Sequence, residues 1–354
     1  MTKKIAFSGS VESWQVLDEN GKIDPTMDPK LPDEKLQAMY ADMVFCRVFD
    51  RKAVSLQRSG RMYTYAPLEG QEASQVGSCA ALSEEDWTFP TYRDHAAFLC
   101  RGAPLDLVFA YWMGFDEGMK MPPEVHTFPT SITVGNHLPL ATGFAWGLAL
   151  KKEKKAVLVY FGDGASSEGD FHESLNFASV FSAPCIFFCQ NNQWAISVPV
   201  KKQMHAETVA QRALSYGAWG VRVDGNDVLG VFTAVKEAQR RALEGLGPSL
   251  IECMTYRMSV HTTADDPKKY RDESEVVLWK KKDPIERFQK YLAGKKLWDE
   301  NFEKSVQESA KNKVDAAVKK AEAYRGEPAA FFDHVFEEKP WHLLEQKDAF
   351  LRGE

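Results

Sequence analysis

The chain has 354 residues, enough for one large domain or two modest ones, and a formal net charge of −6 at pH 7. This acidic balance, with no basic run interleaved with aromatic residues, argues against a nucleic-acid-binding surface. No apolar leader follows Met1, and the longest nearly apolar stretch, Leu138–Leu150, is too short to cross a membrane. We therefore expect a cytoplasmic protein that binds neither nucleic acid nor membrane.

The first part of the chain is expected to contain an arm and then helices. Residues 1–32 are predicted to form an extended arm with a turn at Glu19–Gly21. Apolar residues at helical spacing predict a helix over Asp33–Arg58, and further helices are expected over Gly70–Leu82 and Pro139–Leu150. The small residues of the second helix suit it to close packing against a neighbouring element.

The central segment reads as a strand, a glycine turn, a helix and a second strand. Ala156–Phe161 is a short apolar run typical of a buried strand, and Gly162–Gly164 ends it. Polar residues between Ser166 and Asp170 can cap the helix that follows. Cys185–Gln190 is again strand-like. Two strands joined by one helical crossover are nearly always parallel, so we expect both to end at the same edge of a sheet.

Later segments continue the alternation of strands and helices. Gly220–Val223 and Ser249–Tyr256 are predicted strands, and Leu229–Leu243 is a predicted helix between them. This order predicts an α/β fold with a parallel sheet and helices on both faces, which we assign to residues 33–274. Residues 275–354 are assigned to a helical C-terminal extension. Its apolar end could complete the chain's own core or contact a partner subunit.

Polar side chains stand where the two central strands end. Asp163 follows the first strand and Asn192 the second, and neighbouring strands lie about 4.8 Å apart, so we expect the two side chains to meet. An aspartate in a glycine turn can also cap the next helix, but capping does not explain the joint spacing. Carboxylate and amide oxygens suit Mg²⁺, and the turn before a helix attracts a diphosphate. The sequence therefore predicts a clamp for Mg²⁺ and a diphosphate at the carboxyl edge of the sheet.

These residues resemble a known family. Gly162–Ala178 (GDGASSEGDFHESLNFA) and Phe187–Ser197 (FFCQNNQWAIS) are similar to the thiamine diphosphate signature of 2-oxo acid dehydrogenases. The likeness is to the α subunit of their first, decarboxylating component. It extends from roughly Val16 to Trp298 and includes blocks at Leu68–Gly77, Pro90–His95 and His261–Arg271. The resemblance implies the thiamine diphosphate-binding fold, with thiamine diphosphate and Mg²⁺ as cofactors.

The resemblance also implies which residues bind the cofactors. The metal ligands would be the Asp163 and Asn192 side chains and the main-chain carbonyl of Trp194. Glycines of the turn would approach the diphosphate, an arginine and its neighbouring tyrosine would bind phosphate oxygens, and two main-chain segments would hold the aminopyrimidine ring. The cofactor-binding residues so implied are Tyr92, Arg93, Ile132, Val134, Gly162, Asp163, Gly164, Ala165, Asn192, Trp194 and His261.

His261 is the histidine for which the resemblance implies a catalytic role. It opens a polar loop, His261–Arg271, after a predicted strand. The family's matching histidine lies beside the cofactor, where it can bind the diphosphate and help to transfer the acyl group to a lipoyl thiol. Thr262 falls where some eukaryotic relatives carry a regulatory phosphoserine, and a phosphate there would bring charge and bulk to the mouth of the site.

The chain is expected to need a partner. Thiamine diphosphate enzymes place a carboxylic acid at the pyrimidine nitrogen, and this acid normally belongs to a second α/β domain for which the chain has no room. In two-subunit members of the family the β subunit supplies it as a glutamate. The resemblance therefore implies a heterotetramer of two α and two β subunits, which passes its product to a lipoyl domain of the acyltransferase component.

The expected reaction is the oxidative decarboxylation of a small 2-oxo acid, with pyruvate as the favoured substrate because APLEGQEAS (Ala66–Ser74) resembles bacterial pyruvate-type α subunits. The branched-chain acid 3-methyl-2-oxobutanoate and acetoin remain alternatives. A Mg²⁺-dependent phosphohydrolase with Asp163 as base or ligand is an alternative from another class, although it normally needs more acidic ligands. A scaffold that keeps the fold without the chemistry is the non-catalytic alternative.

Overall fold

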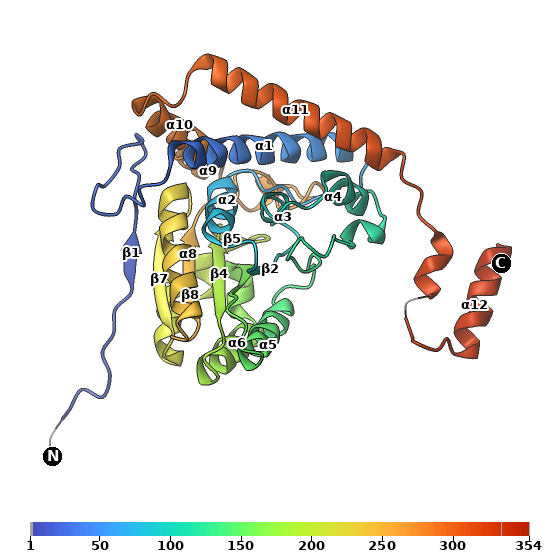
Figure 1. The fold of residues 1–354 in the computed structure, drawn as a ribbon, viewed down its shortest axis with the longest axis horizontal. Coiled ribbons are helices and arrows are strands. Elements are labelled where there is room, and N and C mark those ends of the chain that lie inside the picture. The colour runs from blue at the N-terminus through green and yellow to red at the C-terminus, as the bar shows by residue number, and fades with distance from the viewer. Residues whose placement is uncertain (1–2, 334, 354) are drawn as a thin grey trace.

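A parallel sheet forms the centre of the fold. The computed structural model describes residues 3–333 and 335–353. Within these residues the sheet has six strands in the order β1-β7-β8-β4-β3-β2, and every neighbouring pair is parallel (Figure 1). The strands are β1 (Glu12–Trp14), β2 (Trp87–Phe89), β3 (Val157–Gly162), β4 (Cys185–Asn191), β7 (Trp219–Asp224) and β8 (Ser249–Met254). The α/β architecture expected from the sequence is confirmed.

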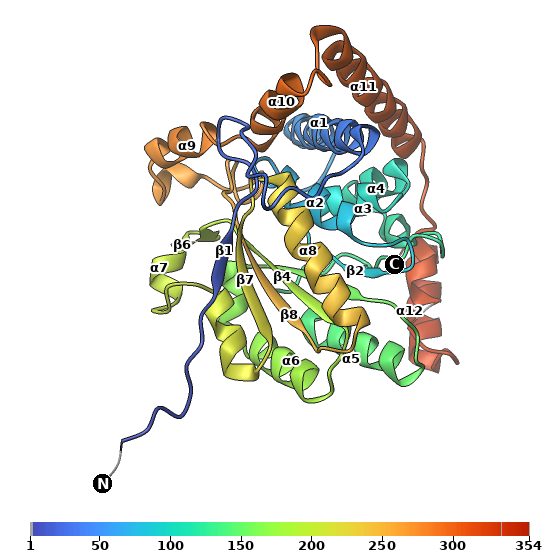
Figure 2. The ribbon, with the colours of Figure 1, turned by 60° about the vertical axis from the view of Figure 1, so that its left-hand side comes forward.

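Helices cover both faces of the sheet. Leu158 and Tyr160 of β3 belong to one buried cluster, and Val157 and Val159 belong to another. Successive side chains of a strand point to opposite faces, so this strand is buried on both. The first cluster includes residues of α1 (Asp33–Arg58), α2 (Glu72–Ala81) and α8 (Val228–Leu243), and the second includes residues of α5 (His137–Leu150) and α6 (Gly169–Val180) (Figures 1 and 2).

The N-terminal arm carries a strand that the sequence did not predict. β1 pairs in parallel with β7 at the edge of the sheet and aligns Glu12 with Val221. Beyond β1, the main-chain N–H groups of Val16 and Leu17 donate to Asp227 Oδ2 at 2.6 and 2.8 Å. The strand is only three residues long, too short for an alternating pattern to stand out, and its partners fix its position.

Several short elements between the main ones were also not predicted. α3 (His95–Cys100) and α4 (Leu105–Trp112) follow β2, while the hairpin of β5 (Trp194–Ala195) and β6 (Val198–Pro199) and then α7 (Val200–Gln203) follow β4. Short 3-10 helices span Asp116–Met119, Asp163–Ser167, Ala210–Tyr216, Pro267–Lys269 and Pro328–Phe332. Such short elements hold too few residues to show a hydrophobic period. β5 and α7 lie against the 3-10 helix that begins at Asp163, and so they border the predicted site.

Helices beyond the sheet make up the C-terminal part of the chain. They are α9 (Glu273–Lys280), α10 (Pro284–Gly294), α11 (Glu300–Glu322) and α12 (Trp341–Arg352). α11 packs along α1, whereas α12 lies at the edge of the molecule (Figures 1 and 2). The side chain of Trp341 on α12 is exposed, and contact of this end with a partner subunit stays a prediction. Among the described residues, none of the helices combines the length and the apolar character that crossing a membrane requires.

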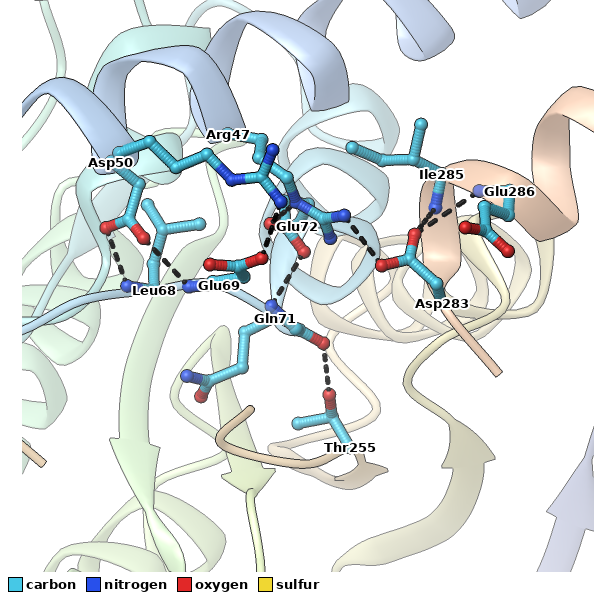
Figure 3. Close-up of polar contacts among 12 residues, drawn as sticks. Arg47, Asp50, Leu68, Glu69, Gln71, Glu72, Thr255, Asp283, Ile285 and Glu286 are labelled. Atoms are coloured by element: carbon cyan, nitrogen blue, oxygen red, sulfur yellow. Dashed lines mark hydrogen bonds and ion pairs between the residues drawn. The ribbon is translucent and has the colours of Figure 1, made fainter. Parts of the chain in front are cut away.

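Asp50 on α1 makes the stability of the fold depend on pH. Its carboxylate accepts hydrogen bonds from the Tyr65 hydroxyl at 2.7 Å and the Leu68 N–H at 2.8 Å, the second of which is drawn in Figure 3. Burial raises the pKa of Asp50 from an ordinary 3.8 to about 7. A folded pKa above the unfolded one means that this group costs stability as the pH rises from about 4 to about 7, after which the cost is constant.

We therefore expect Asp50→Asn to change the pH dependence of unfolding. Between about pH 5 and about pH 7 the wild type should lose roughly 2 kcal/mol more free energy of unfolding than the variant, since each pH unit between the unfolded and folded pKa contributes up to about 1.36 kcal/mol. Denaturant unfolding of both proteins at the two pH values measures this difference. A constant loss from imperfect hydrogen bonds in the variant cancels in the comparison, and equal pH dependence of the two proteins would contradict the prediction.

Candidate cofactor site

A cavity of about 430 Å³ opens at the carboxyl ends of β3 and β4, the edge at which the sequence places the site. The predicted residues that line it are Tyr92, Arg93, Val134, Gly162, Asp163, Gly164, Ala165, Asn192, Trp194 and His261. Ile132 is not among the lining residues, and the residue is 54% exposed, so its predicted main-chain contact gains no support. The fold thus gathers into one cavity residues from segments far apart in the sequence.

Asp163 and Asn192 come together because β3 and β4 are neighbours. The register pairs Gly162 with Gln190, so both side chains emerge just past the paired ends of the strands. Asp163 is buried, and its Oδ2 accepts a hydrogen bond from Gln203 Nε2 at 2.7 Å. Burial raises the pKa of Asp163 to about 6, against the lowering effect of hydrogen bonds from Gln203 and from the Asn192 N–H. The two residues therefore meet as expected, while metal binding by them stays a prediction.

The main-chain carbonyl of Trp194, the third expected metal ligand, lies in the same network. The Trp194 N–H donates to Asn192 Oδ1 at 3.2 Å, and its carbonyl accepts from Arg257 Nη1 at 3.3 Å. A carbonyl oxygen has two lone pairs, so one remains for a cation. The described residues contain no group of three or more His, Cys, Asp or Glu side chains that could hold a metal. The expected set of one carboxylate, one amide and one carbonyl is of a different kind, and it suits a hard cation that keeps other oxygen ligands.

Arg93 fixes the protonation of His261. Arg93 Nη2 donates to His261 Nδ1 at 3.0 Å and to the His261 carbonyl at 2.9 Å, and Arg257 Nη1 lies 3.3 Å from the same ring nitrogen. A guanidinium can only donate, so Nδ1 is the acceptor and the proton of the neutral ring is on Nε2. Burial, and then Arg93 and Arg257, lower the pKa of His261 to about 4. At neutral pH His261 therefore offers one N–H donor.

Arg257 is a residue of this site that the sequence analysis missed. It is fully buried, donates from Nη2 to the Ile196 carbonyl and to the Tyr270 hydroxyl at 2.8 Å each, and has a pKa lowered to about 10, first by burial and then by Arg93. Within the described part of the chain, neither Arg93 nor Arg257 forms a salt bridge with a carboxylate. Buried cations are normally paired, so two unpaired guanidiniums beside one cavity indicate an anion-binding site.

The turn between β3 and α6 is shaped for a ligand that approaches the main chain closely. A Cβ atom on Gly162 would meet no atom within 4 Å, whereas one on Gly164 would come within 2.9 Å of the Ala195 Cβ in the hairpin. The first glycine leaves room in the cavity, and the second allows the hairpin to close over the turn. Together with the oxygen donors and the unpaired guanidiniums, this space fits a metal-bound diphosphate.

The position of Arg257 in the sequence could have predicted its place in the site. Arg257 directly follows the predicted strand Ser249–Tyr256, so the rule that brings Asp163 and Asn192 to one edge also applies to it. Gln203 lies on α7, a four-residue helix without a pattern, and nothing in the sequence points to its contact with Asp163.

Comparisons with known proteins identify the family of the chain. A model of the family described as "Dehydrogenase E1 component" matches residues 40–330. A protein of Acholeplasma laidlawii named pyruvate dehydrogenase E1 component subunit alpha is 44% identical over 333 residues, which cover 93% of this chain and 96% of the relative. Proteins of the same name from Staphylococcus epidermidis and Staphylococcus aureus are each 42% identical over 346 residues, with 97% of this chain and 94% of the relative covered. The chain belongs to the dehydrogenase E1 component family.

Proposed function

We propose that the chain is the α subunit of the E1 component of a pyruvate dehydrogenase, and that its cavity binds thiamine diphosphate with Mg²⁺. The observation that carries this proposal is that the buried guanidinium of Arg93, which has no carboxylate partner among the described residues, lines the same cavity as Asp163 and Asn192, while the buried Arg257 contacts His261 of the cavity wall. Near full-length similarity to proteins named pyruvate dehydrogenase E1 component subunit alpha supports pyruvate as the substrate.

The residues of the cavity divide the binding between metal and diphosphate. The Asp163 carboxylate, the Asn192 amide oxygen and the Trp194 carbonyl would hold Mg²⁺, which also keeps phosphate oxygens as ligands. The Nε2–H of His261, which lines the cavity, is the donor that can meet the diphosphate, and the buried Arg257 beside it adds positive charge. Thiamine diphosphate, when bound, supplies a ring that accepts the electrons released as carbon dioxide leaves.

Arg93 and His261 are proposed to work as a pair. Three hydrogen bonds of Arg93 are made within the protein, because Nη1 donates to the Pro67 carbonyl at 2.7 Å and Nη2 donates to both Nδ1 and the carbonyl of His261. Arg93 therefore orients the imidazole. It adds positive charge to the cavity, but it has no free pair of Nη donors for a bidentate contact with a phosphate. The ring presents its N–H to the ligand, and its lowered pKa keeps it neutral.

A β subunit is part of the proposal, because an α subunit of an E1 component implies one. We propose that two α and two β subunits assemble, that β supplies the glutamate for the cofactor's pyrimidine ring, and that the acyl product passes to a lipoyl domain of the acyltransferase component. The cytoplasmic location and a regulatory phosphate at Thr262 stay predictions.

The proposed substrate preference is tested on the assembled α–β complex. With thiamine diphosphate and Mg²⁺ present, we expect kcat/KM for pyruvate to exceed that for 3-methyl-2-oxobutanoate by about 10-fold or more, since a longer side chain must be accommodated in a pocket built for a methyl group. Steady-state reduction of an artificial electron acceptor measures both rates. Equal rates, or a preference for acetoin, would overturn the choice of pyruvate and leave the family assignment intact.

The same complex separates the proposal from the other classes. A phosphohydrolase would release phosphate from an ester without thiamine diphosphate, and its activity would not respond to the coenzyme. A scaffold would neither bind thiamine diphosphate nor turn over any 2-oxo acid. Calorimetric titration of the coenzyme with and without Mg²⁺ distinguishes these outcomes.

A further inference from the structure

Gln71 is a buried residue of the cavity for which the metal and diphosphate leave no role. It is 1% exposed and stands at the N-cap position of α2, yet its side chain does not cap the helix. Instead, its Oε1 accepts a hydrogen bond from Asn192 Nδ2 at 3.3 Å. Among the described residues its own Nε2 has no hydrogen-bond partner. A buried amide group that lacks a hydrogen-bond partner lowers the stability of the fold, so the placement of Gln71 calls for an explanation.

The contact determines which end of the Asn192 amide can face a cation. The two ends of a carboxamide have nearly the same shape, but one is an oxygen acceptor and the other an NH₂ donor. In Asn192 the NH₂ end is taken by Gln71, and the oxygen end accepts from the Trp194 N–H. With its NH₂ held in this way, Asn192 can offer only oxygen to a metal ion.

The main chain that carries Gln71 is held in place on several sides (Figure 3). Gly70, with φ +101°, donates its N–H to Glu72 Oε2 at 3.0 Å and accepts from the Thr255 hydroxyl at 2.9 Å. Glu72 is in turn paired with Arg47 at 2.7 Å, and the same guanidinium is 2.6 Å from Asp283. A side chain that leaves such a turn starts from a fixed point, which a positioning role requires.

We propose that Gln71 is a positioning residue of the cation site, and that its carbonyl oxygen holds the Asn192 amide so that Asn192 Oδ1 faces the metal. This inference rests on the proposed function, because it assigns the ligand atom within the Asp163–Asn192 pair. It predicts that the acceptor atom at position 71 matters more than the volume of the side chain.

Two substitutions separate an acceptor from a mere filler. Gln71→Met keeps length and burial but cannot accept a hydrogen bond, so Mn²⁺, used as a probe for the Mg²⁺ site, should bind about 10-fold more weakly in the presence of thiamine diphosphate. Gln71→Glu keeps an acceptor for Asn192 Nδ2 and adds negative charge, so Mn²⁺ should bind at least as tightly as in the wild type. A merely structural role would weaken binding in both variants.

The measurement uses the α–β complex and follows free Mn²⁺ by electron paramagnetic resonance. Gln239→Met is the matched control: Gln239 is a buried amide on α8 that donates to Asp86 and accepts from Lys236, and it does not line the cavity. We expect this control to keep its Mn²⁺ affinity even where its melting temperature falls.

A second pair of variants tests the mechanism directly. In an Asn192→Asp background both ends of the side chain are oxygens, so orientation no longer matters, and adding Gln71→Met should cost less than about 2-fold in Mn²⁺ affinity. A full 10-fold loss in that background would overturn the proposal, as would an unchanged affinity of Gln71→Met alone; both leave the proposed function standing. A wild-type complex that binds no Mn²⁺ with thiamine diphosphate would overturn the proposed function and the inference with it.

Discussion

Replacing Arg257 with methionine is expected to weaken the binding of thiamine diphosphate and Mg²⁺ to the α–β complex by about 100-fold or more. The variant loses the buried positive charge next to His261 and the hydrogen bonds that hold the Trp194 and Ile196 carbonyls at the cavity wall, and each hydrogen bond from a charged group is worth roughly 1.5–3 kcal/mol. Arg257 is fully buried, holds the Trp194 and Ile196 carbonyls, and forms no salt bridge with a carboxylate of the described chain. Calorimetric titration of the coenzyme gives the dissociation constant.

Two further variants show whether charge or shape is responsible. Arg257→Lys keeps a cation but loses the planar fork, and burial lowers the pKa of a lysine, so we expect an intermediate loss of about 10-fold. Arg240→Met is the control, because Arg240 is exposed on α8 and pairs with Glu237 and Glu244. Wild-type affinity in Arg257→Met would show that the buried guanidinium serves the apo fold alone.

The central part of the fold could be predicted because its signals are local and repeated. The helix over Asp33–Arg58 was predicted with the bounds that the structure has, and the strand over Cys185–Gln190 is one residue longer in the structure. The meeting of Asp163 and Asn192 followed from one topological rule, that strands joined by a helical crossover end at the same edge. Asp163 and Asn192, which are 29 positions apart in the sequence, could therefore be placed together without a structure.

What was missed depends on contacts that no short pattern records. The three residues of β1 take their place from β7, and the hairpin and α7 are too short to show a period. The roles of Gln71 and Gln203 arise from single hydrogen bonds to Asn192 and Asp163. Arg257 differs from these, because its place after a predicted strand was a usable signal that the sequence analysis did not apply.

Replacing Asp163 with asparagine is expected to remove Mg²⁺-dependent coenzyme binding and, at the same time, to stabilise the apo protein. The variant keeps the shape of the side chain but loses the only carboxylate of the expected metal site, which should reduce affinity by at least about 100-fold for a hard cation. The folded pKa of Asp163 is raised to about 6 by burial, so its ionised form costs stability above that pH. Removing the charge should raise the free energy of unfolding at pH 8 by up to about 3 kcal/mol, and by less at pH 5.

The opposite signs of the two effects make this prediction specific. A substitution that merely damaged the fold would lower both coenzyme affinity and stability. Removing a charge that serves only ligand binding lowers the affinity and raises the stability of the apo protein. Asp170→Asn is the matched control, since Asp170 lies in the first turn of α6 beyond the cavity and should lose only about 0.5 kcal/mol from its interaction with the helix dipole. An Asp163→Asn variant that is less stable without ligand, or that binds the coenzyme as the wild type does, would show that the buried carboxylate serves the fold instead of the metal.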